Sequence, residues 1–481
     1  NPRLRFLLAD DPGAGKTRTL VHRIRFLLAR GVPPESITAV TFTHRAADEM
    51  RARLAGAAEG AERVWIGTFH RFCLELLTTA EGRPPIVLDE REAAAILAEA
   101  ARAMGRDPVK DGPSGREEIG LLKSRGLRPD DAGLPPSLAE LYRRYQERLA
   151  ALGACDYDDL LLRTVALLKA GSPVLSAARA RAGHLLVDEF QDLNAVQYEL
   201  VKLLAASGEN LFVIGDPDQA IYGFRGADPG YFHRLREDFP GTTLIRLERN
   251  YRSTATIVRT ASVFASEGPA KPMGPEGPRP RYLAADGPRS EARAVVEEIE
   301  RLIGGTGMVA ADRQSGRRGG RVFSLGEIAV LFRTARQAGP IEEALLSLGI
   351  PYRLIGQRPL LAAPEVREAL DILRFVDRPS DLRFAIALRE GRFDPGPDAW
   401  AALEGFARDN GCDLETAAAE LLRTGRLSPT AGERLQGFLD LLADLRAHAQ
   451  DLSAEELLLR AAPTGEAGPS RALQQVARAA R

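Results

Sequence analysis

The chain has 481 residues, of which 44% are hydrophobic and 27% charged, and its formal net charge is −1. This length exceeds one ordinary hydrophobic core and predicts about three or four domains, and the composition is that of a globular protein. A net charge near zero excludes a globally basic nucleic-acid binder, so any nucleic-acid site must be a local surface.

The cysteines and histidines argue against two common kinds of site. Cys73, Cys155 and Cys412 are far apart and form no CxxC pair, so neither disulfides nor zinc are expected. The histidines likewise lack metal-ligand spacing. No apolar run reaches the roughly 18 residues of a membrane span, and the N-terminus lacks a signal-peptide pattern. We therefore expect a cytoplasmic protein without a membrane segment.

The first predicted element is the strand FLLA at 6–9, which leads into the segment LLADDPGAGKTRTL at 7–20. A glycine-containing loop between a strand and an amphipathic helix is the context of a phosphate-binding loop. Its backbone N–H groups would bind phosphate, Lys16 would reach the β and γ phosphates, and Thr17 would ligate Mg²⁺.

Further apolar runs with helical stretches between them predict more strands. Alternation of this kind is typical of a parallel sheet covered by helices on both faces. The runs are ITAVTFT at 37–43, HLLVDEF at 184–190, LFVIGD at 211–216 and TLIRL at 243–247. From 79 to 154 the chain turns to Ala, Leu, Arg and Glu at helical spacing, which predicts a mainly helical insertion broken by KDGPSG and GLPP.

Two acidic residues follow the apolar part of LLVDEFQD. Asp188 and Glu189 thereby lie at the tip of a buried strand, where ligands of open α/β sheets bind. A first carboxylate to hold Mg²⁺ and a second to orient and deprotonate water is the pair that ATP hydrolysis needs. We interpret these two residues and the phosphate loop as one nucleotide site.

The strand at 211–216 runs into VIGDPDQAIYGFRGA, which gathers polar and aromatic residues. Gln219 could sense a γ-phosphate, while an aromatic residue and Arg225 could face the bases and backbone of a nucleic acid. This interpretation couples nucleotide state to nucleic-acid binding. Taken alone, the segment also fits an ordinary polar loop at the end of a strand.

The later chain changes character twice. A Pro/Gly-rich passage at 268–281 precedes a second α/β pattern, with a helix at 290–302 and a strand, IAVLFR, at 328–333. The loop GGTGMVAADRQSGRRGGR between them carries four arginines that could touch a nucleic-acid backbone, although a solvated loop is the interpretation we favour. From about 379 onward the chain is expected to be helical.

Seven segments in this order resemble the UvrD/Rep family of superfamily 1 DNA helicases. They are DPGAGKTR, TFTHRAADEM, GTFHRF, DYDDLL, LLVDEFQD, VIGDPDQAIYGFRGA and LERNYRST. The resemblance is close over residues 5–255 and continues weakly to about 378. It implies an α/β fold of two RecA-like P-loop motor domains, the second incomplete, with mainly helical insertions. The implied parts are a first domain at 1–79 and 156–248, its insertion at 80–155, half of a second domain at 249–378 and a partial insertion at 379–481.

The resemblance also implies roles for individual residues. Lys16 matches the phosphate lysine, Thr17 and Asp188 match the two Mg²⁺ positions, and Glu189 matches the catalytic base. Gln219 and Arg252 match γ-phosphate contacts, with Arg252 as an arginine finger. The implied ATP-binding set is Gly13, Ala14, Gly15, Lys16, Thr17, Arg18 and Tyr251, of which Arg18 and Tyr251 pack around the adenine. The DNA-binding set is Phe42, Thr43, His70, Tyr222, Phe224 and Arg225; without the resemblance, Phe42 fits a core strand residue better.

The activity implied by the resemblance is that of an ATP-dependent DNA helicase that moves 3′ to 5′ on single-stranded DNA. ATP and Mg²⁺ would be its cofactors, single-stranded DNA and its junctions with duplex its partners, and DNA repair or replication restart its role. Two alternatives stay open. The chain could be a partner subunit that binds single-stranded DNA and ATP with little turnover, or the motor part of a helicase-nuclease.

The sequence departs from the family pattern in three places. Asp10 stands where the phosphate loop has its first glycine, followed by Asp11. A carboxylate about 5–7 Å from the phosphates would oppose binding by about 2–3 kcal/mol at an effective dielectric of about 20, unless it points to solvent. The segment that reads adenine is not found before the loop, and two later motifs are not found after Lys271, the last lysine. We interpret the sequence as a fragment of a longer helicase; the alternative is a divergent protein.

Overall fold

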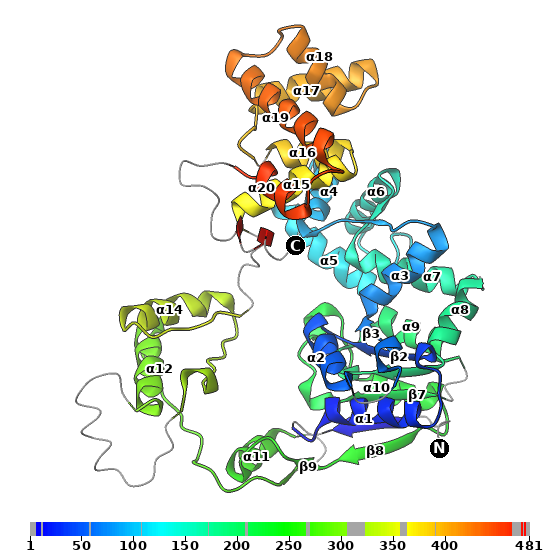
Figure 1. Ribbon diagram of the computed structural model, residues 1–481, viewed down its shortest axis with the longest axis vertical. Coiled ribbons are helices and arrows are strands. Elements are labelled where there is room, and N and C mark those ends of the chain that lie inside the picture. The colour runs from blue at the N-terminus through cyan, green and yellow to red at the C-terminus, as the bar shows by residue number, and fades with distance from the viewer. Residues whose placement is uncertain are drawn as a thin grey trace. The chain divides into compact units, whose positions relative to one another are not determined.

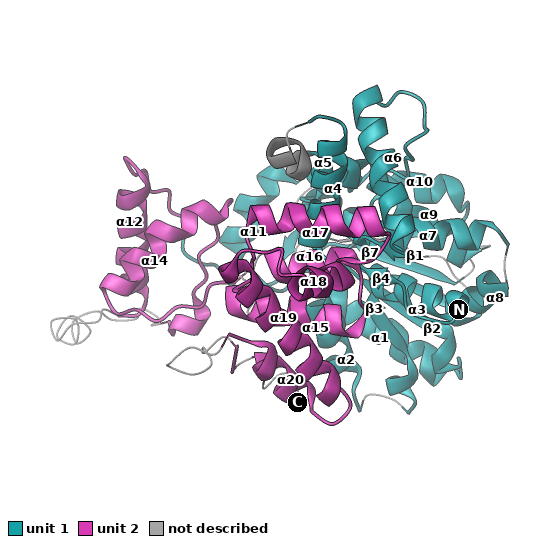
Figure 2. Cartoon of the chain, turned by 90° about the horizontal axis from the view of Figure 1, so that it is seen from above, with its two compact units in different colours: residues 1–280 teal, residues 281–481 magenta. Residues whose placement is uncertain are grey.

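The computed structural model divides into two compact units, residues 1–280 and 281–481 (Figure 2). Each unit is described by itself. The structure describes residues 6–10, 13–56, 59–106, 108–171, 173–206, 210–265, 270–304, 323–355, 363–389, 391–463, 473–474 and 476–477; for 6–10 and 108–114 only the backbone is described.

The first unit is built on a six-stranded parallel sheet with the strand order β3-β2-β6-β7-β1-β8 (Figure 1). Its strands are β1 (Phe6–Asp10), β2 (Ile37–Thr41), β3 (Trp65–Thr68), β6 (His184–Val187), β7 (Leu211–Gly215) and β8 (Thr243–Leu247). The five strands that the apolar runs predicted are confirmed. The sixth, β3, is short and contains Gly67, which weakens the local strand signal.

One face of the sheet is covered by α1 (Lys16–Ala29) and α2 (His44–Leu54). The parallel register places Ala39, Leu186 and Phe212 side by side on neighbouring strands, and all three belong to the core beneath these helices. The amphipathic helix predicted after the phosphate loop is thereby confirmed, because its buried residues recur at helical spacing toward the sheet.

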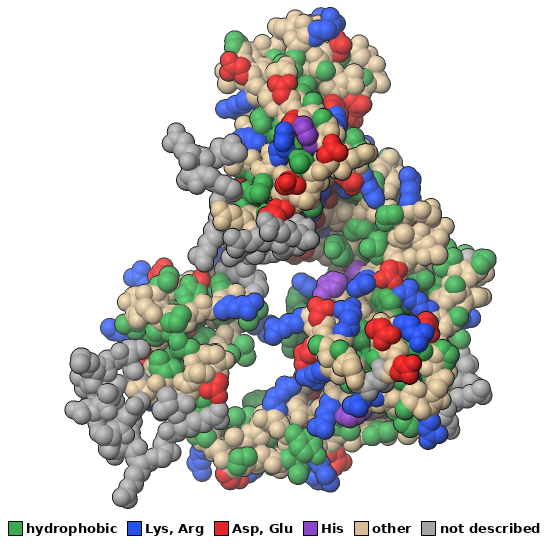
Figure 3. All heavy atoms as spheres, in the orientation of Figure 1, with side chains coloured by type: hydrophobic (Ala, Val, Ile, Leu, Met, Phe, Trp, Pro, Cys, Tyr) green, Lys and Arg blue, Asp and Glu red, His purple; other side chains and the backbone are tan. Residues whose placement is uncertain are grey.

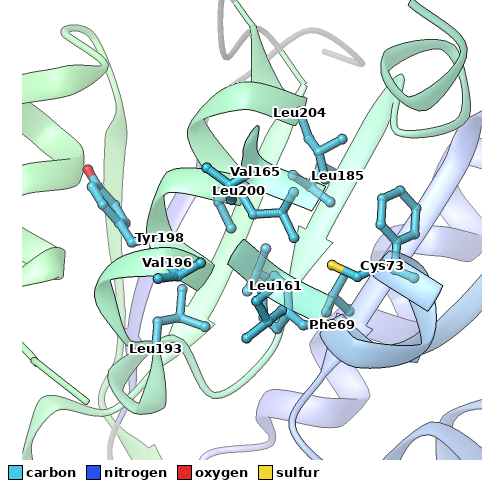
Figure 4. Close-up of a cluster of buried hydrophobic side chains, with 14 of the residues drawn as sticks. Phe69, Cys73, Leu161, Val165, Leu185, Leu193, Val196, Tyr198, Leu200 and Leu204 are labelled. Atoms are coloured by element: carbon cyan, nitrogen blue, oxygen red, sulfur yellow. The ribbon is translucent and has the colours of Figure 1, made fainter. Parts of the chain in front are cut away.

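The opposite face carries the larger core. Val40, Val187 and Val213 are the next residues along the same three strands, and they point to this side because side chains alternate along a strand. The covering helices are α3 (Phe69–Glu81), α7 (Tyr157–Lys169), α8 (Pro173–Arg181), α9 (Ala195–Ala205) and α10 (Tyr231–Asp238). Figure 4 shows Leu185 of β6 surrounded by leucine and valine side chains of these helices.

A mainly helical insertion separates α3 from α7, as predicted. It contains α4 (Glu90–Ala103), α5 (Pro108–Ser124) and α6 (Pro136–Ala151), with a short parallel pair of β4 (Ile86–Val87) and β5 (Ala154–Cys155) at its base. The predicted break at KDGPSG is wrong, since the backbone of α5 stays helical through it. Packing of α5 against α4 overrides the local Gly and Pro signal. The break at GLPP, residues 133–136, is confirmed, because α6 begins only at its last proline, Pro136.

The last elements of the first unit follow β8. They are β9 (Arg249–Asn250), α11 (Ala255–Ala261) and β10 (Lys271–Pro272), and β10 pairs with β9 in parallel.

Both units also contain single helical turns. The described turns are η1 (Pro34–Ser36), η2 (Ala61–Arg63), η3 (Phe190–Asp192), η4 (Pro217–Gln219), η5 (Gly223–Arg225), η6 (Ser262–Phe264), η7 (Leu325–Glu327) and η8 (Ala335–Gln337).

The second unit begins with α12 (Pro288–Leu302) and α14 (Ala338–Ser347), which share a small core. The predicted helix at 290–302 is confirmed, but the predicted strand at 328–333 is wrong. Ile328 and Val330 pack against this core without a ladder neighbour among the described residues. Alternation favours an extended chain, but a strand also needs a hydrogen-bonded partner that local sequence cannot supply. The arginine-bearing loop predicted before it lies almost wholly outside the described residues.

The rest of the second unit is helical, as predicted from residue 379 onward within the described ranges. Its helices are α15 (Pro364–Asp377), α16 (Asp381–Arg389), α17 (Pro397–Asn410), α18 (Leu414–Arg423), α19 (Pro429–His448) and α20 (Ala454–Ala461). α15 packs against α16, α19 and α20, so it shares their core.

In the described part of the chain no single helix is long and apolar enough to cross a membrane. The bent pair α7 and α8 meets the length and composition test only jointly, and both helices contribute to the core under the sheet.

Candidate functional site

The loop between β1 and α1 has the backbone that a phosphate loop requires. Gly13 and Gly15 have φ angles of +81° and +102°, in the left-handed region that favours glycine. Lys16 is the first residue of α1, and the carbonyl of Gly15 accepts the hydrogen bond of Thr19 N–H at 3.0 Å. The first N–H groups of α1 are therefore free to bind an anion. The side chain of Asp10 and the whole of Asp11 lie outside the described residues.

The acidic pair follows β6 at the carboxyl edge of the sheet, as predicted. Asp188 N–H donates to the carbonyl of Val40 at 2.9 Å, which extends the ladder with β2 by one bond. Glu189 has a φ of +48°, an unusual conformation for a residue other than glycine. This turn brings its Oε2 to 3.8 Å from Lys16 Nζ, so the predicted phosphate lysine and catalytic base are neighbours.

Burial leaves polar atoms of this site without partners. Lys16 Nζ and Asp188 Oδ1 are buried, and neither has a hydrogen-bond partner among the described residues. Burial, and then the charge of Glu189, raise the pKa of Asp188 to about 7. A bound cation and phosphate oxygens would satisfy these atoms.

The donor set fits Mg²⁺ in the way expected of a nucleotide site. Within the described ranges, no three His, Cys, Asp or Glu side chains are grouped to hold a metal. Mg²⁺ is commonly held by one or two protein oxygens together with substrate phosphates, and Thr17 at the start of α1 with Asp188 after β6 would supply such oxygens.

A glutamine that the sequence interpretation left without a role joins two strands of the site. Gln191 Nε2 donates to Glu189 Oε2 at 2.9 Å, and its Oε1 accepts from Asp216 N–H at 3.0 Å. A Cβ at Gly215 would lie 2.5 Å from that Oε1, so the approach requires glycine at the end of β7. Gln191 was visible in the LLVDEFQD motif, but its partner on β7 was not.

The predicted γ-phosphate sensor lies after β7. Gln219 Nε2 donates to Asp216 Oδ2 at 2.6 Å, and burial raises the pKa of Asp216 despite this hydrogen bond. A chain of contacts thus runs from Glu189 through Gln191 to Asp216 and Gln219. The edge of the sheet is tied together by side chains at the ends of β6 and β7.

The segment after β9 closes against the phosphate loop. Tyr251 N–H donates to the carbonyl of Gly13 at 3.2 Å, and a Cβ at Gly13 would lie 2.7 Å from Cβ of Arg252. Asn250 Oδ1 holds this turn by accepting from the N–H groups of Arg252 and Ser253 at 3.0 and 2.9 Å. Tyr251 is exposed, as is Arg18 on α1. The structure therefore brings the predicted ATP-binding residues together, and Asn250 is a further residue that the sequence interpretation missed.

The residues predicted to contact DNA gather mostly in one place. A groove of about 760 Å³ is lined by Phe42, His70, Tyr222, Phe224 and Arg225, together with residues of α4, α5 and α7. Thr43, the sixth predicted residue, is not among the residues that line the groove. Its hydroxyl accepts the hydrogen bond of Ala46 N–H and caps α2.

Aromatic rings form the walls of this groove. Phe42 and Tyr222 stack with centroids 4.9 Å apart, and the Arg225 guanidinium lies 5.7 Å from the centroid of Phe224. Phe224 is 73% exposed, and Phe42 is half-buried rather than a core residue. Exposed aromatic faces beside a guanidinium suit the stacking of bases and contact with a phosphate backbone.

The lining of the groove also includes a residue without a predicted role. Tyr157, the first residue of α7, is 57% exposed, and its ring meets the edge of His70 at a centroid distance of 5.5 Å. Burial, and then the charge of His44, lower the pKa of His70 to about 4, so its imidazole is neutral near pH 7. The DYDDLL motif contains Tyr157, but only the fold brings it into the lining of the same groove as Phe224.

Charge on the surface is mixed. Figure 3 shows Lys and Arg side chains interspersed with Asp and Glu on the drawn face of the first unit, in keeping with the net charge of −1. The groove is mixed in the same way. Its lining contains two arginines, Arg116 and Arg225, and six acidic residues, Asp89, Glu90, Glu117, Asp156, Asp158 and Asp192.

Comparison with known proteins gives matches along most of the chain. Residues 3–240 match the UvrD/REP helicase N-terminal domain, and residues 245–390 match the UvrD-like helicase C-terminal domain. The chain is 33% identical over 473 residues to DNA helicase II of Escherichia coli K12, covering 94% of this chain and 63% of that protein.

Two other relatives give similar figures. The chain is 31% identical over 475 residues to the ATP-dependent DNA helicase PcrA of Staphylococcus epidermidis, covering 94% of this chain and 63% of that protein. It is 33% identical over 490 residues to the ATP-dependent DNA helicase UvrD1 of Mycobacterium tuberculosis H37Rv, covering 92% and 60%. The chain thus spans 60–63% of the length of these relatives.

Proposed function

The chain belongs to the UvrD/REP helicase family, and on that premise we propose that it is the motor part of an ATP-dependent DNA helicase. Its fold is of the RecA-like P-loop type that this family has. The observation that carries the proposal is the pairing of Lys16 with Glu189 beside the left-handed glycines of the phosphate loop. ATP is the proposed nucleotide and single-stranded DNA the proposed track.

The proposed nucleotide chemistry assigns each group a task. The N–H groups at the start of α1 bind phosphate. Lys16 reaches the β and γ phosphates, which supply the hydrogen-bond partners that its buried ammonium lacks among the described residues. Thr17 and Asp188 hold Mg²⁺, which when bound neutralises phosphate charge. Glu189 orients the attacking water and accepts its proton, with its carboxylate fixed by Gln191.

The proposed coupling to DNA rests on the loop after β7. Gln219 lies at the nucleotide end of this loop, while Tyr222 and Phe224 lie in the groove five residues or fewer further on. A change in the contacts of Gln219 when the γ-phosphate leaves would shift the aromatic residues that stack on bases. Movement from 3′ to 5′ and a role in DNA repair or replication restart in the cytoplasm are proposed by family resemblance.

Two acidic residues of the phosphate loop support a second candidate function. Asp10 and Asp11 place negative charge at the phosphate loop, which favours a subunit that binds single-stranded DNA with little ATP turnover. The motor part of a helicase-nuclease would use the same residues for ATP and single-stranded DNA.

Strand displacement tests the proposal. The full-length protein is mixed with a duplex that carries a 3′ single-stranded tail, with a matched 5′-tailed duplex as control. ATP-dependent unwinding of the 3′-tailed substrate, lost in Lys16→Ala, is expected. Single-stranded DNA binding without unwinding of either substrate would favour the subunit with little turnover.

A further inference from the structure

A buried lysine lies behind the walls of the groove. Lys123, the residue before the last in α5, has a fully buried side chain. Its Nζ lies 2.6 Å from Asp156 Oδ2 and 2.8 Å from Asp159 Oδ1. The rings of Tyr142 and Tyr145 enclose the ammonium, with centroids 5.8 and 4.9 Å away. A buried lysine is unusual, and this one is matched by two carboxylates and two aromatic rings.

The two carboxylates also build the start of α7. Asp156 Oδ1 accepts from Asp159 N–H at 2.9 Å, and Asp159 Oδ2 accepts from Asp156 N–H at 3.2 Å, which forms a capping box. Each carboxylate therefore uses one oxygen for the helix cap and the other for Lys123. Tyr157 is the next residue after Asp156, so the ammonium fixes the turn that presents this ring to the groove.

The adjacent residue of α5, Ser124, contacts the turn that carries Phe224. A Cβ at Gly226 would lie 2.2 Å from Oγ of Ser124 and 3.1 Å from its Cβ, so the Ser124 side chain packs directly against the backbone of Gly226. Gly226 has a φ of +85° and ends η5, the turn that carries Phe224 and Arg225. Ser124 Oγ is itself held by donating to the carbonyl of Leu121 at 2.8 Å.

We infer that the end of α5, Lys123 with Ser124, is a positioning element that sets the spacing between the two aromatic walls of the strand-binding groove. Lys123 holds the wall with Tyr157 and His70 through the cap of α7, and Ser124 supports the wall with Phe224. Neither residue needs to touch the strand. The inference rests on the proposed function, because it assigns these residues to the single-stranded DNA site.

Lys123→Met tests whether Lys123 positions the start of α7, because the substitution roughly keeps the length of the side chain and removes its charge. Two carboxylates would then be buried without their cation, and the cap of α7 would rearrange. The matched control is Lys202→Met on α9, because Lys202 likewise contacts a carboxylate, Asp238 at 3.1 Å, and a tyrosine ring, Tyr198 at 5.9 Å. Lys202 does not line the groove.

The readout is ATP hydrolysis by the full-length protein as oligo-dT is titrated, together with its thermal melting curve. For Lys123→Met the oligo-dT concentration that gives half-maximal stimulation is expected to rise about tenfold. A rise of this size corresponds to the loss of stacking on roughly one base. The KM for ATP and the rate of hydrolysis without DNA should stay within about twofold of the wild-type values. A general structural defect would change these two values as well. A folded Lys123→Met with unchanged half-maximal concentration overturns the inference.

Gly226→Ala tests whether Ser124 positions the turn that carries Phe224. This variant alone tests the inference if Lys123→Met does not melt cooperatively. Its Cβ would collide with Ser124 and push Phe224 outward, so a rise in the half-maximal oligo-dT concentration is expected. Adding Ser124→Gly removes the collision and should restore part of the affinity. An unchanged response in Gly226→Ala overturns the inference. If the wild type shows no response to oligo-dT, the proposed function fails, and the inference with it.

Discussion

Lys16 Nζ and Glu189 Oε2 lie 3.8 Å apart, although the two residues are 173 positions apart in the sequence. The contact depends on the parallel sheet, which brings the end of β1 and the end of β6 to the same edge, and on the positive φ of Glu189. It joins the two halves of the proposed nucleotide site.

Removal of Gln191 should slow hydrolysis more than it weakens ATP binding. Gln191→Leu removes the hydrogen bonds to Glu189 and to Asp216 N–H, so the catalytic carboxylate loses its orientation. We expect kcat to fall by about 10- to 100-fold, with a smaller change in KM for ATP. Steady-state kinetics at saturating single-stranded DNA measure both constants. A loss confined to KM would contradict the orienting role.

Loss of the exposed ring at Phe224 should weaken DNA binding without harming the fold. Phe224→Ala removes a stacking face, and one stacked base contributes about 1–3 kcal/mol. The dissociation constant for oligo-dT, measured by fluorescence anisotropy, should rise by about tenfold or more. Phe224→Trp keeps an aromatic face and serves as the control. Equal affinities for the Ala variant and the wild type would remove Phe224 from the DNA site.

A change at Asp10 tests the unusual start of the phosphate loop. Asp10→Gly restores the family pattern and removes a negative charge that opposes phosphate by about 2–3 kcal/mol if it lies close. The Kd for ATP should then fall, and the effect should shrink at high salt because screening weakens charge repulsion. Calorimetric titration at two salt concentrations measures this. An unchanged Kd would indicate that the carboxylate points to solvent.

Acid should destabilise the first unit through His70. Burial lowers the pKa of His70 to about 4, whereas the unfolded chain has the ordinary value of 6.5. The stability from this group is complete above pH 6.5 and is lost as the pH falls toward 4, because the unfolded chain binds the proton first. At pH 5 the loss is about 2 kcal/mol.

Urea unfolding at pH 7 and pH 5 checks this linkage. The difference in the free energy of unfolding between the two pH values should be smaller in His70→Gln than in the wild type. His233→Gln, at a 77% exposed side chain on α10, is the matched control and should behave like the wild type. Equal pH dependence in His70→Gln and the wild type would contradict the assignment.

The position of the candidate nucleotide site could be predicted from the sequence largely because its residues follow buried strands. Strands of a parallel sheet are covered on both faces and therefore appear as short apolar runs, and their carboxyl ends meet at one edge. Lys16, Asp188 and Gln219 could be assigned in this way, with the family resemblance supplying their roles. β3 was not predicted because Gly67 interrupts a run of only four residues.

The remaining features depend on contacts between distant parts of the chain. Gln191 bridges two strands, Asn250 braces the turn against the phosphate loop, and Tyr157 faces the groove only after the insertion has folded. Residues 328–333 have the apolar alternation of a strand, but no described segment pairs with them. Local patterns determine which conformation a segment favours, whereas its partner is set by the rest of the fold.

The most direct test is ATP hydrolysis by the full-length protein with and without single-stranded DNA, beside Lys16→Ala and Glu189→Gln. We predict strong stimulation by DNA in the wild type and a loss of at least about 100-fold in both variants. Glu189→Gln should still bind ATP, because only the base is removed. Hydrolysis that does not respond to DNA, or that survives Glu189→Gln, would contradict the assignment of this site as a DNA-driven motor.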